Sequence, residues 1–391
     1  MSAVLIRSLV PRRWRARVVM LAVAVPMASG AVVGVSVPPA AAACGDRSSY
    51  NAEAVQNGGT WTARNGGRTV YSGGDMRAAV QAAIDSLSSG RTSKEWVVVR
   101  GNGSMSAGSR ISMRSYTGID VCGTVNVTGS GSGDQAPIYA RGARDIEVRY
   151  LYLTGSPLYG IFMRNVENVV LGDIQMRLSS GLGVRIDNHG DRSVRSRNIA
   201  IDQVYVSGSS THGVETYGVD GLTVNRVTAR NTGGSGLLLN DTVNASVTRV
   251  DADGAGTGTG YAALRFANRN GRVGDGYPAN IRVGSVKARG GGRGVFCVSE
   301  SGGAVIDQVD LAYTGNNAVL LENCYNMTIS SGTIDGGGEV RIAARSEFPP
   351  SRDITLQNLH VANTNIRWSP CAGSNIVLRN VTRTNSNLYW C

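Results

Sequence analysis

Residues 183–187 read Gly-Val-Arg-Ile-Asp and residues 213–217 read Gly-Val-Glu-Thr-Tyr, so in both a small residue precedes an alternating run. This five-residue phrase occurs ten times between Ala136 and the C-terminus, at intervals of 21 to 31 residues. The copies begin at Pro137, Gly160, Gly183, Gly213, Gly236, Ala263, Gly294, Ala318, Glu339 and Asn365. Alternation with a period of two is typical of β-strands, and strands that recur at such intervals predict a stacked, repetitive fold.

A second alternating run follows most copies, for example residues 221–227, Gly-Leu-Thr-Val-Asn-Arg-Val. Short strands, glycine or asparagine at the corners and almost no helical periodicity predict an all-β, right-handed parallel β-helix of the pectate-lyase-like kind. The Leu and Asn spacing of leucine-rich repeats is absent, which disfavours that class of solenoid. We therefore expect one elongated domain.

Three segments are expected along the chain. Residues 1–43 have the arginine cluster, apolar run and small-residue cleavage site of a secretory signal peptide, which predicts a secreted protein. Residues 44–135 would form an N-terminal arm, a capping helix and the first coils, and residues 136–391 the regular coils with a disulfide-tied C-terminal cap. Pro26 interrupts the apolar run, so a retained membrane span is disfavoured.

One amphipathic helix is expected, over residues 75–87, with Asp75 at its start and Gly90 just past its end. An open solenoid end exposes core and unpaired strand edges, so this helix is expected to plug the first coil. Residues 44–73, rich in Gly and Asn, are expected to form an extended arm.

The six cysteines all lie beyond the signal segment. An even number in an oxidising compartment favours three disulfides over a lipidated first cysteine. Pairing of nearest neighbours would join Cys44 to Cys122, Cys297 to Cys324, and Cys371 to Cys391. The sequence alone leaves this connectivity open.

The chain is basic, and its charge is carried almost entirely by arginine. Loss of the five arginines before Cys44 would lower the formal charge from +11 to +6, and only two lysines are present. Because the planar fork of arginine suits carboxylates, an acidic polymer is the expected partner, with a solubilising surface as the alternative. Aromatic residues are scarce at 6% and no nucleic-acid motif occurs, so nucleic acid is disfavoured. We expect a monomer.

In each copy the second and fourth positions are apolar and should point inward, which leaves positions three and five facing solvent. Arg185 and Arg265, both at position three, would lie three rungs or about 14 Å apart, the length of a few sugar units. Two of the three histidines fall in the same stretch. The candidate site residues in and near it are Arg185, Asp187, His189, His212, Glu215, Tyr217, Asn240, Arg265 and Asn268, with Arg341 further along.

Some of these residues also have structural interpretations. Arg185 could pair with Asp187 or Glu215 only to keep the sheet soluble. Asn240 could be a turn or ladder asparagine, and His212 a hydrogen-bonding corner residue. Tyr217 is the strongest functional candidate, because a tyrosine among a histidine, an acid and arginines suits proton transfer.

Residues 211–224 and residues 258–271, Gly-Thr-Gly-Tyr-Ala-Ala-Leu-Arg-Phe-Ala-Asn-Arg-Asn-Gly, resemble secreted β-helix proteins linked to alginate lyases. The architecture also resembles pectate lyases and chondroitinase-B-like lyases. The resemblance implies β-elimination on a uronate-containing polysaccharide such as alginate. In that reaction a base removes the proton beside the carboxylate, a cation or amide neutralises the carboxylate, and an acid protonates the departing oxygen.

The resemblance also implies roles for the candidate residues. Arg265, helped by Asn240 or His212, would neutralise the carboxylate, and Tyr217 would act as base, acid or both. Flanking sugars would be bound by Arg185, Asp187, His189, Glu215, Asn268 and Arg341. No cofactor is expected; calcium near Asp187 and Glu215 is an alternative that no repetitive Asp motif supports.

The alternatives to a lyase are a glycoside hydrolase, a uronan epimerase and a non-catalytic binding solenoid. A hydrolase needs converging carboxylates, for which Asp187, Glu215 and Asp241 are available, but the sequence motifs of polygalacturonases are missing. A uronan epimerase shares the first proton abstraction, and residues 217–220 are similar to the start of the epimerase phrase Tyr-Gly-Phe-Asp-Pro-His, yet Gly and Leu follow here. A non-catalytic binding solenoid would repeat similar outward residues, whereas these are varied and clustered.

Overall fold

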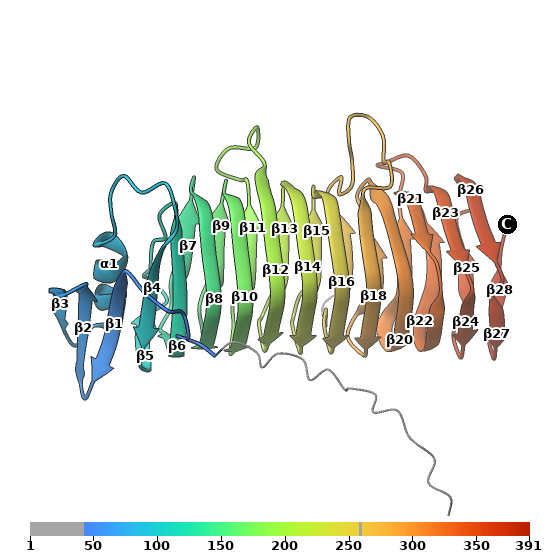
Figure 1. Cartoon of the computed structure of the whole chain (residues 1–391). Helices are drawn as coiled ribbons and strands as arrows, with labels where there is room; N and C mark the ends of the chain where they lie inside the picture. Colours follow the sequence, from blue (N-terminus) through green and yellow to red (C-terminus); the bar gives the residue numbers. More distant parts are fainter. Residues whose placement is uncertain (1–42, 258–259) are drawn as a thin grey trace, which may run out of the picture. The chain divides into compact units, whose positions relative to one another are not determined.

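The computed structural model describes residues 43–257 and 260–391, which form one right-handed parallel β-helix (Figure 1). The predicted fold class is confirmed. Apart from residue 43, the expected signal peptide lies outside the described residues. Within the described part, no helix has the length and the apolarity needed to cross a membrane.

Each regular coil contains one short strand and one long strand. The short strands stack in register as one parallel sheet, called here the short-strand sheet, which the C-terminal ends of two longer strands extend. Its members are β7 (Ile138–Arg141), β9 (Tyr159–Arg164), β11 (Leu182–Asp187), β13 (Val214–Tyr217), β15 (Leu237–Asn240), β17 (Leu264–Ala267), β19 (Arg293–Cys297), β25 (Ile366–Trp368) and β28 (Leu388–Tyr389), with the ends of β20 (Ser301–Glu322) and β22 (Gly332–Ala343).

The long strands bend in their middle and so supply the remaining walls of the solenoid. In β10 the buried positions are Val169 and Leu171 and then Ile174 and Met176, so the inward phase shifts by one residue between the two pairs. The long strands are β6 (Thr117–Thr128), β8 (Arg144–Gly155), β10 (Glu167–Leu178), β12 (Ser196–Ser207), β14 (Val219–Arg230), β16 (Val243–Asp253) and β18 (Ile281–Arg289). Shorter strands replace them in the last coils: β21 (Cys324–Ile329), β23 (Arg352–Gln357), β24 (Leu359–Ala362), β26 (Ser374–Arg379) and β27 (Thr382–Thr384).

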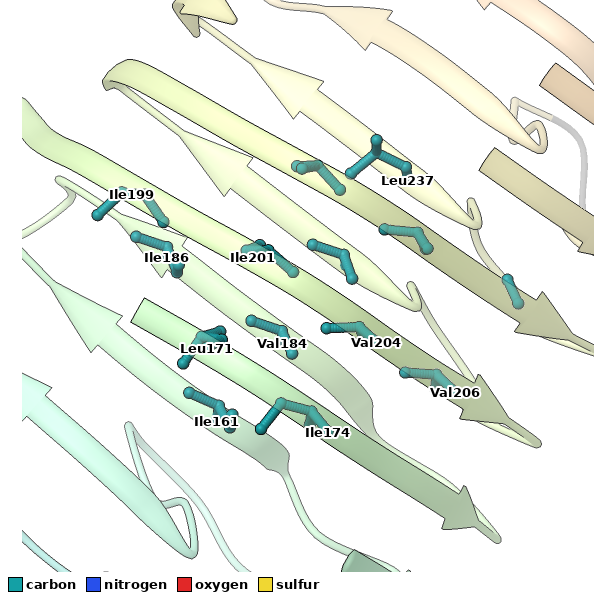
Figure 2. Close-up of a cluster of buried hydrophobic side chains, with 14 of the residues drawn as sticks. Ile161, Leu171, Ile174, Val184, Ile186, Ile199, Ile201, Val204, Val206 and Leu237 are labelled. Atoms are coloured by element: carbon teal, nitrogen blue, oxygen red, sulfur yellow. The ribbon is translucent and has the colours of Figure 1, made fainter. Parts of the chain in front are cut away.

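The core is a continuous stack of aliphatic side chains. Figure 2 shows Val184 and Ile186 of β11 in this stack beside Ile199 and Ile201 of β12, and all four are at most 2% exposed. Burying one such side chain stabilises the fold by roughly 1.5–3 kcal/mol. The prediction that positions two and four of the phrase point inward is confirmed.

The small first residue of the phrase is required by the stacking of the coils. A Cβ on Gly183 would lie 2.3 Å from the carbonyl oxygen of Gly213, and one on Gly213 would lie 2.7 Å from that of Gly236. Real Cβ atoms do not approach this closely, so a side chain here would push neighbouring coils apart.

The N-terminal end is capped by α1 (Met76–Asp85), as predicted. Asp75 accepts a hydrogen bond from the backbone N–H of Ala78 at 3.1 Å, which caps the helix, and Val80 and Ile84 are buried in the core. After α1 the chain enters the solenoid through β4 (Glu95–Arg100) and β5 (Gly103–Ser106).

The expected extended arm is wrong over most of its length, because it folds into an antiparallel meander of β1 (Ala52–Asn57), β2 (Thr60–Asn65) and β3 (Arg68–Gly73). Its two turns carry Asn-Gly-Gly at residues 57–59 and 65–67, which is a hairpin signal. Alternating residues of β1 and β2, among them Trp61 and Ala63, are buried in the core.

The three disulfides join Cys44 to Cys122, Cys297 to Cys324, and Cys371 to Cys391, so the expected pairing is confirmed. The first ties the segment before β1 to β6, and the second ties β19 to β21. The third closes the C-terminal coil, where Trp390 packs against Trp368.

Candidate functional site

The outer face of the short-strand sheet is only partly open to solvent. At position three Phe162, Leu238, Phe296 and Leu320 are at most 7% exposed, so the prediction that this position faces solvent is wrong for them. Leu238 and Phe296 belong to an apolar cluster that includes Ala262, which lies in the segment before β17. Flanking segments thus cover part of the outer face, and some polar side chains of this face are largely shielded from solvent.

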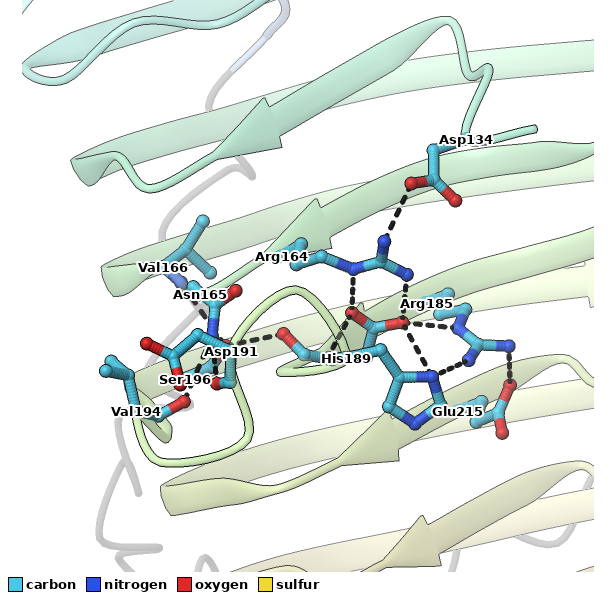
Figure 3. A network of polar contacts seen from close by, with 11 residues as sticks. Asp134, Arg164, Asn165, Val166, Arg185, His189, Asp191, Val194, Ser196 and Glu215 are labelled. Carbon is cyan, nitrogen blue, oxygen red and sulfur yellow. Dashed lines mark hydrogen bonds and ion pairs between the residues drawn. The ribbon is translucent and has the colours of Figure 1, made fainter.

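A cluster of ion pairs is centred on Asp187 of β11, whose side chain is completely buried. Arg164 of β9 donates two hydrogen bonds to this carboxylate, at 2.6 and 3.0 Å, and Arg185 donates a third at 2.8 Å (Figure 3). Burial by itself would raise the pKa of Asp187, but the hydrogen bonds from the two arginines outweigh it, and the pKa is lowered. Asp187 therefore positions arginines in this structure and presents no surface to a ligand.

The ion pairs continue on both sides of this centre. Arg164 also contacts Asp134 at 2.7 Å, and Arg185 contacts Glu215 at 3.2 Å and the Nδ1 atom of His189 at 3.2 Å. The structural interpretation of Arg185 paired it with Asp187 or Glu215, and in the structure Arg185 forms ion pairs with both.

Glu215 of β13 lies at the edge of this cluster and is 8% exposed. It accepts a hydrogen bond from the amide of Asn240 at 3.2 Å, and Asn240 accepts one from Asn268 at 2.8 Å. Burial raises the pKa of Glu215 and the charge of Arg185 opposes this, with a net increase. Glu215 is thus a nearly buried carboxyl whose pKa lies above its ordinary value.

His212 lies at the corner that leads into β13. Its Nδ1 atom accepts a hydrogen bond from the backbone N–H of Ser235 at 2.8 Å, so the proton of the neutral ring is on Nε2. Burial lowers the pKa of His212 to about 4, and the positive charges of Arg265 and Arg185 act in the same direction. At neutral pH His212 is therefore a neutral hydrogen-bond donor. Gly234 packs against the ring, since a Cβ there would lie 2.5 Å from Nδ1.

Arg265 of β17 has no carboxylate partner among residues 43–257 and 260–391. Its guanidinium lies between the rings of Tyr261 and Phe296, at 5.5 and 5.2 Å from their centroids. Its Nε atom is buried and has no hydrogen-bond acceptor, and burial lowers the pKa of the side chain. An arginine held by aromatic rings with unused donors is suited to binding an anion.

Tyr217 is at the C-terminal end of β13, on the same face as His212 but at the opposite margin. It contacts His189, with ring centroids 4.4 Å apart, and Arg192 at 5.6 Å. It also lines a hollow of about 620 Å³ together with Asn268. The register places Tyr217 two rungs and two residues from Arg265, or about 12 Å between their Cα atoms.

The sequence-predicted residues therefore fall into two groups on one face. His212 and Arg265 meet at Tyr261, whereas Tyr217, His189 and Asn268 lie at the opposite margin. Arg341 stands apart on β22, with a buried Nε atom that has no acceptor.

Sequence reasoning missed Tyr261, whose ring centroid is 5.2 Å from that of His212, and it missed Arg164 and Asp134 as members of the ion cluster. Tyr261 lies in a corner segment, two residues before the copy that begins at Ala263, so the pattern of the phrase gave no information about it. Arg164 occupies position five of the copy before that of Asp187, and the pairing of equal positions in neighbouring copies was the available signal.

No group of three or more His, Cys, Asp or Glu side chains suited to holding a metal ion occurs in the part of the chain that the structure describes.

No family model and no curated protein matches this sequence. Among solved structures, the A-module of mannuronan C-5 epimerase AlgE6 from Azotobacter vinelandii is similar with a TM-score of 0.41 at 14% identity, covering 80% of this chain and 94% of that one. The A-module of AlgE4 from the same organism has a TM-score of 0.40 at 13% identity, covering 81% and 92%. The surface protein and adhesin PfbA of Streptococcus pneumoniae has a TM-score of 0.36 at 9% identity, covering 81% and 96%. Likeness at this level assigns no residue of the site.

Proposed function

We propose that this protein is a secreted polysaccharide lyase that cleaves a uronate-containing polymer, such as alginate, by β-elimination on the outer face of the short-strand sheet. The observation that carries the proposal is Arg265, a largely buried guanidinium that lies between two aromatic rings and has no carboxylate partner in the described part of the chain. The three disulfides fit an oxidising compartment outside the cell.

In the proposed mechanism Arg265 and the Nε2–H of His212 donate hydrogen bonds to the uronate carboxylate. This neutralises the carboxylate, acidifies the neighbouring C–H and stabilises the enolate-like charge that develops when the proton leaves. His212 is unsuited to act as the base, because its Nδ1 lone pair is used by Ser235 and its other nitrogen carries the proton.

Proton transfer is assigned to Tyr217, which faces the same surface from the opposite margin. As phenolate it removes the proton beside the carboxylate, and the electron pair of that C–H bond forms the new carbon–carbon double bond. The glycosidic oxygen then leaves with its bonding pair and takes up a proton from the tyrosine hydroxyl. Tyr261, beside the Arg265 guanidinium, is the alternative proton carrier.

The deciding experiment is incubation of the purified protein with alginate, polygalacturonate, glucuronan and chondroitin. A lyase produces ultraviolet absorbance from an unsaturated uronate at the new chain end. New reducing ends without that absorbance would identify a hydrolase. Altered uronate stereochemistry in uncut polymer, seen by NMR, would identify an epimerase, and no change in any polymer would favour a binding solenoid.

The roles of the tyrosines are separated by Tyr217→Phe and Tyr261→Phe. We expect Tyr217→Phe to lower kcat by at least about 100-fold, because general acid and base catalysis is lost while the ring remains. Tyr205→Phe on β12, whose ring contacts Arg177, is the matched control and should keep full activity. Full activity of Tyr217→Phe together with loss in Tyr261→Phe would move the proton-transfer role to Tyr261.

A further inference from the structure

Further along the outer face lies a second group of arginines that form no ion pair with a carboxylate of the residues that the structure describes. Arg293 of β19 and Arg341 of β22 line one hollow of about 600 Å³, together with Asn317, Thr364 and Asn365. Both arginines come from the short-strand sheet, so their positions are set by strands rather than by mobile segments.

The donors of these two arginines are not used up by the protein. The Nη1 atom of Arg293 and the Nε atom of Arg341 are buried and have no hydrogen-bond acceptor. Within residues 43–257 and 260–391, the side chain of Arg293 donates one hydrogen bond, from its Nε atom to the side-chain oxygen of Asn317 at 3.2 Å, and that acceptor is neutral.

The carboxylates near the hollow are engaged elsewhere. Glu339, which lines it, is ion-paired with Arg367 at 2.9 Å. Glu322, whose charge acts on Arg293, is ion-paired with Arg345 at 2.8 Å. The hollow therefore holds two positive charges that no carboxylate among the described residues neutralises by an ion pair, which favours an anionic ligand.

This hollow and the proposed catalytic site lie on the same short-strand sheet. The register runs from Arg265 through Phe296 and Leu320 to Arg341, three rungs or about 14 Å. Arg293 lies between them, and its guanidinium is 4.7 Å from the centroid of Phe296, the ring that also contacts Arg265 at 5.2 Å. The three arginines thus form one row along the solenoid.

We infer that Arg293 and Arg341 form a second carboxylate subsite, which binds another uronate residue of the same polymer chain that Arg265 binds. The inference rests on the proposed function, because it takes the ligand to be a uronan. The inference adds that the protein binds carboxylates at two places along one extended polymer. An oligosaccharide that is too short to reach from Arg265 to the second subsite would therefore occupy only one of the two sites.

The test is calorimetric binding of a uronate disaccharide and of the matching octasaccharide to the full chain, with ultraviolet absorbance recorded in parallel. We expect Arg293→Gln and Arg341→Gln each to weaken octasaccharide binding about tenfold and to leave disaccharide binding within about twofold, since each loses one charge-assisted contact. Arg282→Gln is the control, because Arg282 is exposed, lies on β18 and is paired with Asp307.

Unchanged octasaccharide affinity in both variants, with native circular dichroism, would overturn the inference, and so would failure of the unsubstituted protein to bind the octasaccharide. The lyase proposal is judged separately by the absorbance. If octasaccharide binding weakens in the variants although no unsaturated uronate ever forms, the subsite stands and the lyase chemistry falls.

Discussion

His212 shows how burial decides the chemistry of a single side chain. The same imidazole in water would be partly charged near neutrality, but here burial and two neighbouring arginines hold its pKa at about 4. The backbone hydrogen bond from Ser235 selects the tautomer that carries its proton on Nε2. His212 is thereby converted from a possible base into a neutral donor beside Arg265.

Because the pKa of His212 is lowered in the folded chain, the free energy of unfolding decreases as the pH falls. Between the ordinary value of 6.5 and about 4, the unfolded chain binds this proton and the folded chain does not, so the stabilisation is complete above that window and is lost as pH falls through it. We expect the stability advantage of the natural chain over His212→Gln to shrink by on the order of 3 kcal/mol between pH 7 and pH 4.

Urea unfolding at the two pH values measures this difference. NMR titration of the His212 ring provides the direct check, with His212→Gln to assign its signal. A titration midpoint near the ordinary value for histidine would contradict the neutral-donor assignment.

The short strands place these side chains through their stacking. Because the strands pair in strict parallel register, residues at the same position of consecutive copies become neighbours, as Arg185, Glu215 and Leu238 show. The glycine at the first position of the phrase allows this spacing, because a Cβ there would meet the backbone of the neighbouring coil.

We expect Gly183→Ala to destabilise the protein by about 1–3 kcal/mol, as overpacking does in other cores, because its Cβ would meet the carbonyl oxygen of Gly213. Gly59→Ala is the control, since no atom lies within 4 Å of a Cβ placed there. Chemical denaturation compares the two variants. Equal stability of Gly183→Ala and the natural chain would show that the coils separate without cost.

The molecule as a whole is a stack in which each coil contacts mainly its neighbours, so its stability is local rather than uniform. The N-terminal end is covered by α1 and the β1–β3 meander. At the C-terminal end β26, β27 and β28 each pair on one side only, with β23, β24 and β25. The disulfide between Cys371 and Cys391 ties this last coil together.

Replacement of Cys371 and Cys391 by serine should therefore loosen the end of the stack without unfolding its centre. We expect faster amide hydrogen exchange in residues 374–391 and unchanged exchange in β11 and β13, because the opening of terminal coils is independent of distant ones. Exchange measured by mass spectrometry tests this, and activity should be retained. Faster exchange throughout the chain would instead indicate one cooperative unit.

The sequence by itself determined the solenoid, the inward positions and the helical cap, each of which follows from local periodicity. It left the disulfide connectivity open, and the structure shows the nearest-neighbour pairing. The Gly-rich segment before the helix was misjudged, because its Asn-Gly-Gly turns were not weighed as hairpin signals.

Only the tertiary structure decided which outward residues are free to bind. The phrase puts Asp187 and Arg265 on the same outer face, yet Asp187 is buried under two arginines, whereas Arg265 has no carboxylate partner among the residues that the structure describes. The side chains that make this difference, Arg164, Tyr261 and Phe296, come from other coils or corners. Arg164 and Phe296 belong to neighbouring coils, and Tyr261 belongs to a corner segment outside the phrase. For this reason the repeat alone could locate the face but not the site.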